Sequence, residues 1–200
     1  MFKHWLGNEQ EHNRETMSSN IGDRATHELY LWPFMNAVKA NVASVMCSYN
    51  KLNGTWACES DAVLNDLLKD ELGFPGYVMS DWNAQHTGVN SALAGLDMTM
   101  PGSDFNKPPG SIFWGPNLVE AVTNGSVPQS RLDDMATRIL ASWYLLGQDQ
   151  GYPEVTFSSW NGGKATVDVT ADHASVVRTV ARDSIVLLKN QEHALPLRKP

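Results

Sequence analysis

The chain has 200 residues, of which 42% are hydrophobic, and its 22 acidic and 15 basic residues give a net charge of −7 at pH 7. This apolar content is enough for a sizeable core, which excludes a disordered chain. No run of five or more basic residues occurs, so the sequence does not indicate a nucleic-acid partner. No apolar stretch approaches the ~18 residues that a membrane-spanning helix needs.

The first half of the chain begins with a helical pattern and then a strand pattern. Apolar residues recur near helical spacing over residues 23–40, where Asp23 is the predicted N-cap and Pro33 marks a kink or restart. Small and apolar residues on both faces predict a strand over Val42–Tyr49. A strand of this kind is covered on both sides, as in a parallel sheet.

The same alternation continues downstream. Ser60 is expected to cap a second helix, which Gly73 ends. Tyr77–Ser80 reads as a short buried strand, and a helix-sized stretch over 85–94 leads to another apolar segment at 96–100. Strands alternating with helices at this spacing predict an α/β fold with parallel strands. In such folds the loops after the strands carry the chemistry.

The composition changes after the clearest helical pattern, at residues 130–146. Residues 147–164 are rich in Gly, Pro, Gln, Ser and Asn and predict an interdomain linker. Residues 165–200 then read as the start of a second α/β domain, with a helix over 170–182 and a buried strand over 184–189. The predicted domains are therefore 1–146 and 165–200, joined by this linker.

Two cysteines and two glycosylation sequons bear on the cellular compartment. Cys47 and Cys58 are eleven residues apart and form no C-x-x-C metal or redox motif, which leaves two buried thiols or one disulfide. Sequons begin at Asn53, inside the loop between the cysteines, and at Asn124. Together these features favour a secreted chain with one short-loop disulfide.

Several catalytic motifs are absent from the sequence. It has no H-E-x-x-H, no P-loop, no G-x-G-x-x-G and no G-x-S-x-G, which disfavours zinc hydrolases, nucleotide-binding proteins and serine hydrolases. One carboxylate at a predicted strand end, Asp81, is followed by Trp82. A carboxylate beside an aromatic face suits a sugar site, because carboxylates serve glycoside hydrolysis and rings pack on sugars. The alternative is a helix cap followed by a core tryptophan.

Four motifs together resemble family 3 glycoside hydrolases, most closely the fungal secreted β-glucosidases: K-H-W-L-G-N-E-Q-E, S-V-M-C-S-Y-N, G-F-P-G-Y-V-M-S-D-W and A-G-L-D-M-T-M-P-G. A fifth segment, A-R-D-S-I-V-L-L-K-N, is similar to the start of that family's second domain. The resemblance implies the C-terminal part of a (β/α)8 TIM-like barrel, followed by the start of an α/β sandwich domain. A complete barrel needs about 250 residues, so we expect the first strands and the later domains to lie outside this chain.

The resemblance also implies roles for individual residues. Asp81 is expected to be the nucleophile of a retaining β-glucosidase that acts on cellobiose and short β-glucans, without a metal or organic cofactor. Arg14 is expected to keep a nearby carboxylate ionised through its opposite charge. The implied substrate-binding residues are Lys3, His4, Arg14, Met46, Tyr49 and Trp82.

The sequence departs from the family pattern in one important respect. The family's acid/base is a glutamate on the second domain, and Glu192 stands in the wrong context to be it. We therefore expect the 200-residue chain alone to be inactive.

A β-xylosidase of the same family is an alternative function. That branch commonly has Cys where Trp82 stands, which argues against it. The hexosaminidase branch of the family carries K-H-F-P-G-H in place of K-H-W-L-G-N, which argues against that branch as well. A non-catalytic carbohydrate-binding or regulatory remnant is the alternative from another class.

Overall fold

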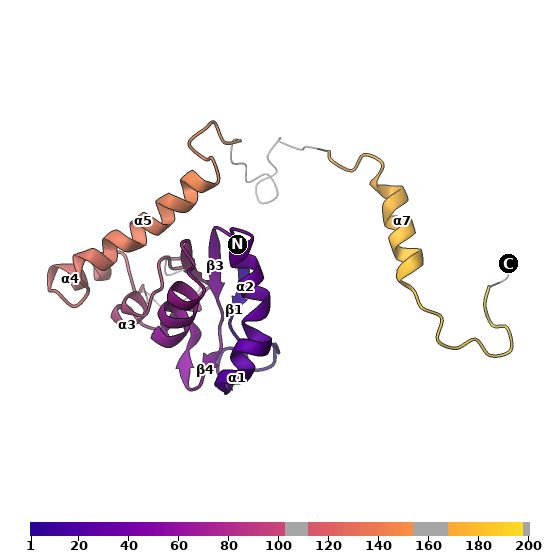
Figure 1. Cartoon of the computed structure of the whole chain (residues 1–200), viewed down its shortest axis with the longest axis horizontal. Helices are drawn as coiled ribbons and strands as arrows, with labels where there is room; N and C mark the ends of the chain where they lie inside the picture. Colours follow the sequence, from indigo (N-terminus) through magenta and orange to yellow (C-terminus); the bar gives the residue numbers. More distant parts are fainter. Residues whose placement is uncertain (103–111, 154–167, 198–200) are drawn as a thin grey trace. The chain divides into compact units, whose positions relative to one another are not determined.

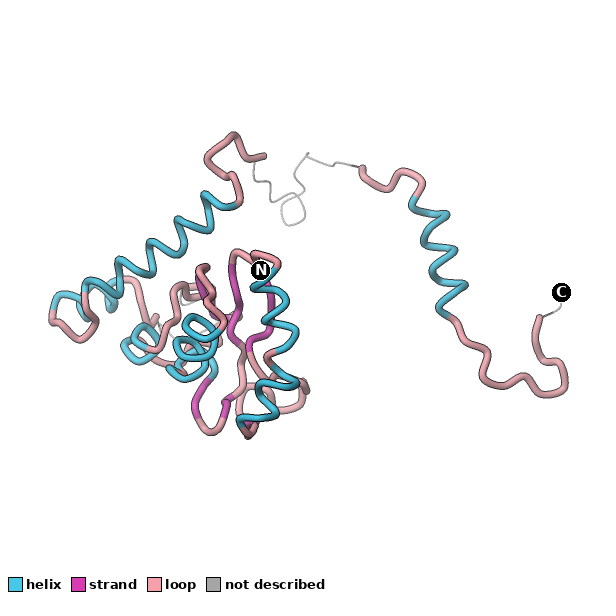
Figure 2. The backbone as a smooth tube through the Cα atoms, in the orientation of Figure 1, coloured by secondary structure: helices cyan, strands magenta, loops and turns pink. Residues whose placement is uncertain are grey.

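The computed structural model describes residues 1–102, 112–153 and 168–197. The chain divides into two compact units, Met1–Tyr152 and Pro153–Pro200. In the first unit, helices pack around a small sheet, whereas the described part of the second consists of one helix and loops (Figures 1 and 2).

Three parallel strands form the main sheet of the first unit: β1 (Phe2–Trp5), β3 (Ser44–Cys47) and β6 (Tyr77–Ser80). They are hydrogen-bonded in chain order, β1-β3-β6, and a further parallel bridge joins Met79 to Met98. Parallel neighbours require a crossover, and helices fill both crossovers here. The predicted α/β arrangement with parallel strands is confirmed.

The two faces of this sheet differ in burial, because successive side chains of a strand point to opposite faces. One face is fully enclosed and carries Val45, Cys47, Val78 and Ser80, none of which is more than 1% exposed. On the other face Met46, Met79 and Met98 stand in register and are half-buried.

The first crossover is helical over α1 (Asp23–Ala25), η1 (Thr26–Tyr30) and α2 (Trp32–Lys39). This agrees with the helix predicted over 23–40. Pro33 lies in the first turn of α2, where a missing backbone N–H breaks no helical hydrogen bond.

The second crossover is the helix η3 (Ala62–Glu71), which buries Leu64 and Leu68 completely. The helix ends with an i→i+5 hydrogen bond from Leu72 N to Leu67 O (3.0 Å). Gly73 follows at φ +63°, a conformation that glycine adopts easily, so the predicted helix end is confirmed.

Of the two predicted N-caps, the one at Asp23 is wrong, whereas Ser60 stands at the N-cap position. Asp23 lies in the first turn of α1, and neither it nor the N-cap residue Gly22 makes a side-chain cap. Ser60 is extended (φ −94°, ψ 108°) directly before the first helical residue, Asp61, and its backbone carbonyl accepts from Leu64 N (2.9 Å). Its position is therefore that of an N-cap, although the described contacts include no bond from a helix N–H to its hydroxyl. Residue type alone does not fix where the first helical turn begins, and α1 begins at the residue that was predicted to cap it.

Among the described residues of the first unit, three helices follow β6. The helix α3 (Val89–Leu93) is shorter than the predicted 85–94, because residues 81–88 form a loop. The helix α4 (Pro116–Thr123) was not predicted. The helix α5 (Gln129–Leu145) agrees with the predicted 130–146 and is followed by Gly147 at φ +66°.

A second, smaller sheet lies beside the end of β3. It consists of β2 (Ser18–Ser19), β4 (Lys51–Leu52) and β5 (Thr55–Trp56), in the order β2-β4-β5. The antiparallel β4–β5 hairpin turns at Asn53–Gly54, whose φ values of 48° and 90° suit a two-residue hairpin turn. The short helix η2 (Ala57–Glu59) follows at once.

The second unit contains the helix α7 (His173–Ser184), close to the predicted 170–182. The predicted buried strand over 184–189 is wrong: Ile185–Leu188 are 59–92% exposed and form no strand. A strand needs a neighbour to pair its backbone groups, and the described part of this unit, 168–197, offers none. The predicted linker is described only up to residue 153. No described helix is long and apolar enough to cross a membrane.

Candidate active site

Asp81 stands directly after β6, at the carboxyl end of the parallel sheet. Its backbone N–H donates to the carbonyl of Cys47 at the end of β3 (3.1 Å), which ties the two strand ends together. The Asp81 side chain is 12% exposed. It is thus held in place yet remains open to a small reactant, as expected of a residue at this edge of an α/β sheet.

Three donors converge on the Asp81 carboxylate. His4 Nε2 lies 3.0 Å from Oδ2, and the Tyr49 hydroxyl donates to Oδ1 at 3.0 Å. The backbone N–H of Trp82 also donates to Oδ1, at 2.6 Å. His4 belongs to β1 and Tyr49 follows β3, so three neighbouring strands each contribute one member of the cluster. These donors fix the orientation of the carboxylate and stabilise its negative charge.

Tyr49 is held in its neutral form. Burial of the phenol raises the pKa of Tyr49 to about 12, and its hydrogen bond to Asp81 and the negative charge of Asp81 add to the effect. The Tyr49 hydroxyl therefore keeps its proton at neutral pH and remains a donor to Asp81. The Arg14 guanidinium lies 4.3 Å from the centre of the Tyr49 ring, and its positive charge opposes part of this rise in pKa.

Buried polar side chains hold the end of β1 against β3. The Ser48 hydroxyl contacts the carbonyls of Trp5 (2.9 Å) and Leu6 (3.2 Å), and Asn50 Nδ2 donates to Leu6 O (3.1 Å). Ser48 is 1% exposed and Asn50 is fully buried. These contacts fix the strand that carries His4. No role was predicted for Ser48 or Asn50, although the run of three polar residues directly after an apolar strand is a signal that could have indicated one.

A family model for the glycosyl hydrolase family 3 N-terminal domain matches residues 1–142. The chain belongs to glycosyl hydrolase family 3. Among the family 3 relatives, a probable β-glucosidase L of Neosartorya fischeri is 80% identical over 198 residues, and a β-glucosidase of Pyricularia oryzae is 62% identical over 198 residues. These matches cover 99% of this chain, which spans only 27% and 26% of the two relatives.

Solved family 3 structures agree with this assignment. The β-glucosidase D2-BGL from Chaetomella raphigera superposes with a TM-score of 0.86 at 64% identity, over 99% of this chain and 27% of that one. A β-D-glucoside glucohydrolase from Trichoderma reesei gives a TM-score of 0.85 at 60% identity, with the same coverage. The α/β architecture of the family is therefore shown for this chain.

The family 3 site residues expected from the sequence do not all gather at Asp81. His4 and Tyr49 contact the carboxylate directly. Arg14 does not: its guanidinium lies on the Tyr49 ring and pairs with Glu11 (2.7 Å), so it reaches Asp81 only through Tyr49. The described contacts of Arg14 are thus with the Tyr49 ring and Glu11, and its expected effect on the charge of a nearby carboxylate stays a prediction.

The other expected contacts lie around the cluster. Lys3 is exposed on β1, and none of the described residues gives it a hydrogen bond or ion pair. Met46 is half-buried on the face of β3 opposite Cys47. Trp82, directly after Asp81, is 46% exposed. Within the described ranges no group of three or more His, Cys, Asp or Glu side chains could hold a metal ion.

The two cysteines form a disulfide. Cys47 and Cys58 are bonded, with their Cα atoms 5.3 Å apart, which confirms the pairing suggested by the sequence. Cys47 is the residue whose carbonyl holds the Asp81 backbone, so the disulfide joins the segment after the β4–β5 hairpin to the edge of the site.

Proposed function

We propose that the chain carries the nucleophile side of a retaining β-glucosidase site, with Asp81 as the nucleophile. The observation that supports this most strongly is the Asp81 carboxylate at the end of β6, oriented by His4, Tyr49 and the Trp82 amide while its side chain stays partly exposed. The names of the relatives and of the solved structures point to the same activity.

The reaction has two steps. In the first, an Asp81 oxygen forms a bond to the anomeric carbon while the bond from that carbon to the leaving oxygen breaks, and an acid protonates the leaving oxygen. In the second, water attacks the anomeric carbon, its proton passes to the conjugate base of that acid, and glucose leaves with Asp81 regenerated. The acid must stand about 5–5.5 Å from the nucleophile, and we assign it to a glutamate outside this chain.

The surrounding residues have roles that follow from this proposal. His4, together with Lys3, would bind hydroxyls of the glucosyl unit, and Trp82 would offer an exposed ring face to the sugar. Arg14 would act on the site through Tyr49, and Met46 would line its wall. The substrates would be β-glucosides such as cellobiose and short β-glucans. A β-xylosidase would instead prefer the sugar without the hydroxymethyl group.

The fold fits the same proposal. We infer that β1, β3 and β6 are consecutive strands of a TIM-like barrel whose interior is lined by Met46, Met79 and Met98, and that α7 begins an α/β sandwich domain. Two observations support this inference: the strands are parallel and follow one another in chain order, and the side chains on one face of the sheet are only half-buried. The disulfide and the exposed sequon residues Asn53 and Asn124 suit a secreted glycoprotein.

Rescue by an external nucleophile tests the role of Asp81. The experiment uses an enzyme of the relatives' length in which this chain forms the corresponding segment. Asp81→Gly should lose turnover of an aryl β-glucoside, and added azide should restore cleavage and give the α-glucosyl azide, because azide attacks from the vacated side. Asp66→Gly, at an exposed carboxylate on η3, is the control and should remain active without azide. Absence of the α-azide, or a preference for aryl xylosides over glucosides, would contradict the proposal.

A further inference from the structure

The loop that follows Asp81 is held by a closed ring of contacts. The Trp56 ring on β5 stacks on His86, with ring centroids 3.8 Å apart and planes 14° from parallel. His86 stands five residues after Asp81. Trp56 stands two residues before Cys58, which is bonded to Cys47, and the Cys47 carbonyl accepts the Asp81 N–H at 3.1 Å. The contacts therefore form a closed path: from Asp81 to Cys47, through the disulfide to Cys58, along the chain to Trp56, across the stack to His86, and along the loop back to Asp81.

A hydrogen bond beside the stack joins the same two segments. The Thr87 hydroxyl donates to Glu59 Oε2 at 2.6 Å. Thr87 directly follows His86, and Glu59 directly follows Cys58. Lys51 Nζ lies 4.4 Å from the centre of the Trp56 ring and adds a cation–π contact. Trp56 and His86 are both half-buried and do not belong to the hydrophobic core. Their stacking thus fixes one loop against another rather than filling the interior.

We propose that the Trp56–His86 stack and the Cys47–Cys58 disulfide form one brace that positions Asp81, with Trp56 and His86 as positioning residues. The proposal rests on the role of Asp81 as nucleophile. Residues 81–88 contain no helix or strand, so the backbone that carries Asp81 depends on contacts with neighbouring segments. Attack on an anomeric carbon requires close alignment of the reacting atoms, and small displacements of the nucleophile lower the rate strongly.

Kinetics of ring variants test this brace, again in an enzyme of the relatives' length that carries this chain. Trp56→Ala and His86→Ala should each lower kcat roughly 2- to 10-fold, as expected from the usual strength of an aromatic pair. The KM for an aryl β-glucoside should change little, because neither ring is proposed to touch the sugar. Trp56→Phe and His86→Phe keep a flat ring and should recover most of kcat.

A matched control and a double variant sharpen the test. Trp143→Ala removes another ring contact, with Tyr144 on α5, and should leave kcat unchanged. The double variant Trp56→Ala/His86→Ala should be no slower than either single variant, because both open the same ring of contacts. The kcat values are calculated per active site titrated with a slow 2-fluoroglucoside, so partial unfolding does not enter them.

The outcomes separate the two proposals. If the 2-fluoroglucoside labels Asp81 and the alanine variants keep the wild-type kcat, the brace is refuted while the proposed function stands. A raised KM at constant kcat, or failure of the phenylalanine variants to recover, also refutes the brace. If the reagent labels another residue of the wild type, the proposed function itself fails, whatever the variants do.

Discussion

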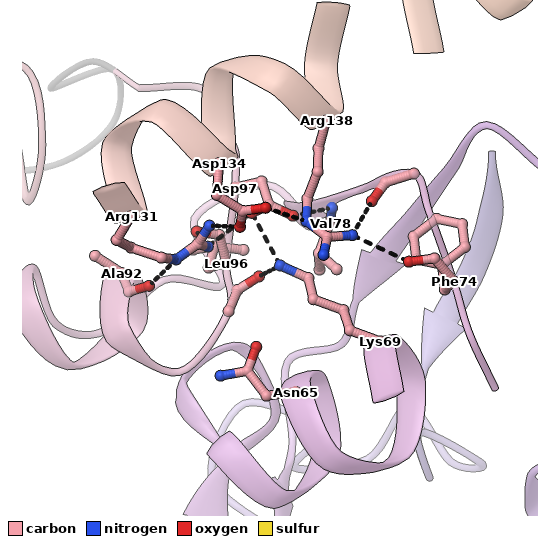
Figure 3. Close-up of polar contacts among 12 residues, drawn as sticks. Asn65, Lys69, Phe74, Val78, Ala92, Leu96, Asp97, Arg131, Asp134 and Arg138 are labelled. Atoms are coloured by element: carbon pink, nitrogen blue, oxygen red, sulfur yellow. Dashed lines mark hydrogen bonds and ion pairs between the residues drawn. The ribbon is translucent and has the colours of Figure 1, made fainter. Parts of the chain in front are cut away.

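Two aspartates of the same sheet region, Asp81 and Asp97, stand in opposite surroundings. The Asp97 side chain is completely buried, whereas that of Asp81 is 12% exposed. Asp97 Oδ1 accepts from Lys69 (3.0 Å) and Arg131 (2.7 Å), and Oδ2 accepts from the backbone of Val78 (2.8 Å; Figure 3). Asp97 thus has two cationic partners, while Asp81 has a histidine, a phenol and a backbone amide.

The partners of Asp97 continue into a network that fixes α5 on the sheet. Arg131 also donates to the carbonyls of Ala92 (2.8 Å) and Leu96 (2.9 Å). About two turns further along α5, Arg138 pairs with Asp134 (2.9 Å) and donates to the carbonyl of Phe74 (3.0 Å; Figure 3). Lys69, Arg131 and Arg138 therefore join η3 and α5 to the segments around the sheet.

If Asp81 is the nucleophile, as proposed, the contrast separates a structural carboxylate from a reactive one. Burial is costly for an ion unless partners compensate fully, and Asp97 has such partners. A nucleophile needs access to its target and a charge that cations do not fully neutralise; Asp81 is partly exposed, and its described contacts include no Lys or Arg side chain. The following predictions would break or sharpen this comparison, and all refer to an enzyme of the relatives' length that carries this chain.

The largest effect on activity is expected at Asp81. Asp81→Asn keeps the shape of the side chain but removes the attacking charge, so turnover of an aryl β-glucoside should fall by at least about 10³-fold. The melting temperature should change by only a few degrees. Steady-state kinetics and thermal unfolding on the same samples check both statements, and a variant that remains active would show that Asp81 is not the nucleophile.

The largest effect on stability is expected at Asp97. Asp97→Asn leaves Lys69 and Arg131 without their shared anion inside the protein, which should destabilise the fold by roughly 3–5 kcal/mol. Urea unfolding should show this loss, while Asp66→Asn on the exposed side of η3 should change stability by less than about 0.5 kcal/mol. Equal stability of the two variants would mean that the buried network does not hold α5 on the sheet.

Parts of this comparison could be read from the sequence and parts could not. The local patterns predicted β3, β6 and α5, and the motif resemblance predicted that His4 and Tyr49 belong with Asp81. Nothing local indicates that Lys69, 28 residues before Asp97, and Arg131, 34 residues after it, meet at one carboxylate.

Two strand predictions failed for the same reason, which is that a strand depends on a pairing partner far away in the sequence. Phe2–Trp5 was not predicted as a strand because its polar residues hide the pattern, and it forms β1 only by pairing with β3. Residues 184–189 have a strand pattern but no partner in the described part of their unit. Pairing over long sequence distances decides both cases, and a local pattern does not contain that information.

Tyr49→Phe tests how the site holds its carboxylate. The change removes the hydroxyl that donates to Asp81, so kcat/KM should fall roughly 10- to 100-fold, as for the loss of a hydrogen bond to a charged group. Because the pKa of Tyr49 is raised to about 12, the phenol does not titrate at working pH. The alkaline limb of the pH–rate profile should therefore be the same in both proteins, and a shifted alkaline limb in the variant would contradict this assignment.

The smallest effect is expected from Lys69 and depends on pH. Burial lowers the pKa of Lys69 to about 8 in the folded protein, from an ordinary value of 10.5. Between these values the unfolded chain binds more protons, so stability should rise with pH from about 8 to 10, by at most about 1.4 kcal/mol per pH unit. Lys69→Met should remove this rise and Lys39→Met, at an exposed lysine on α2, should not. A stability that falls over this range only when Lys69 is present would contradict the assignment.

Covalent trapping tests the central claim most directly. A 2-deoxy-2-fluoroglucoside with a good leaving group forms the glycosyl ester but slows its hydrolysis, so the nucleophile stays labelled and can be located by peptide mass spectrometry. We predict a single labelled peptide, with the sugar on Asp81 and none on Asp97. A label on any other carboxylate, with Asp81 unmodified, would contradict the account.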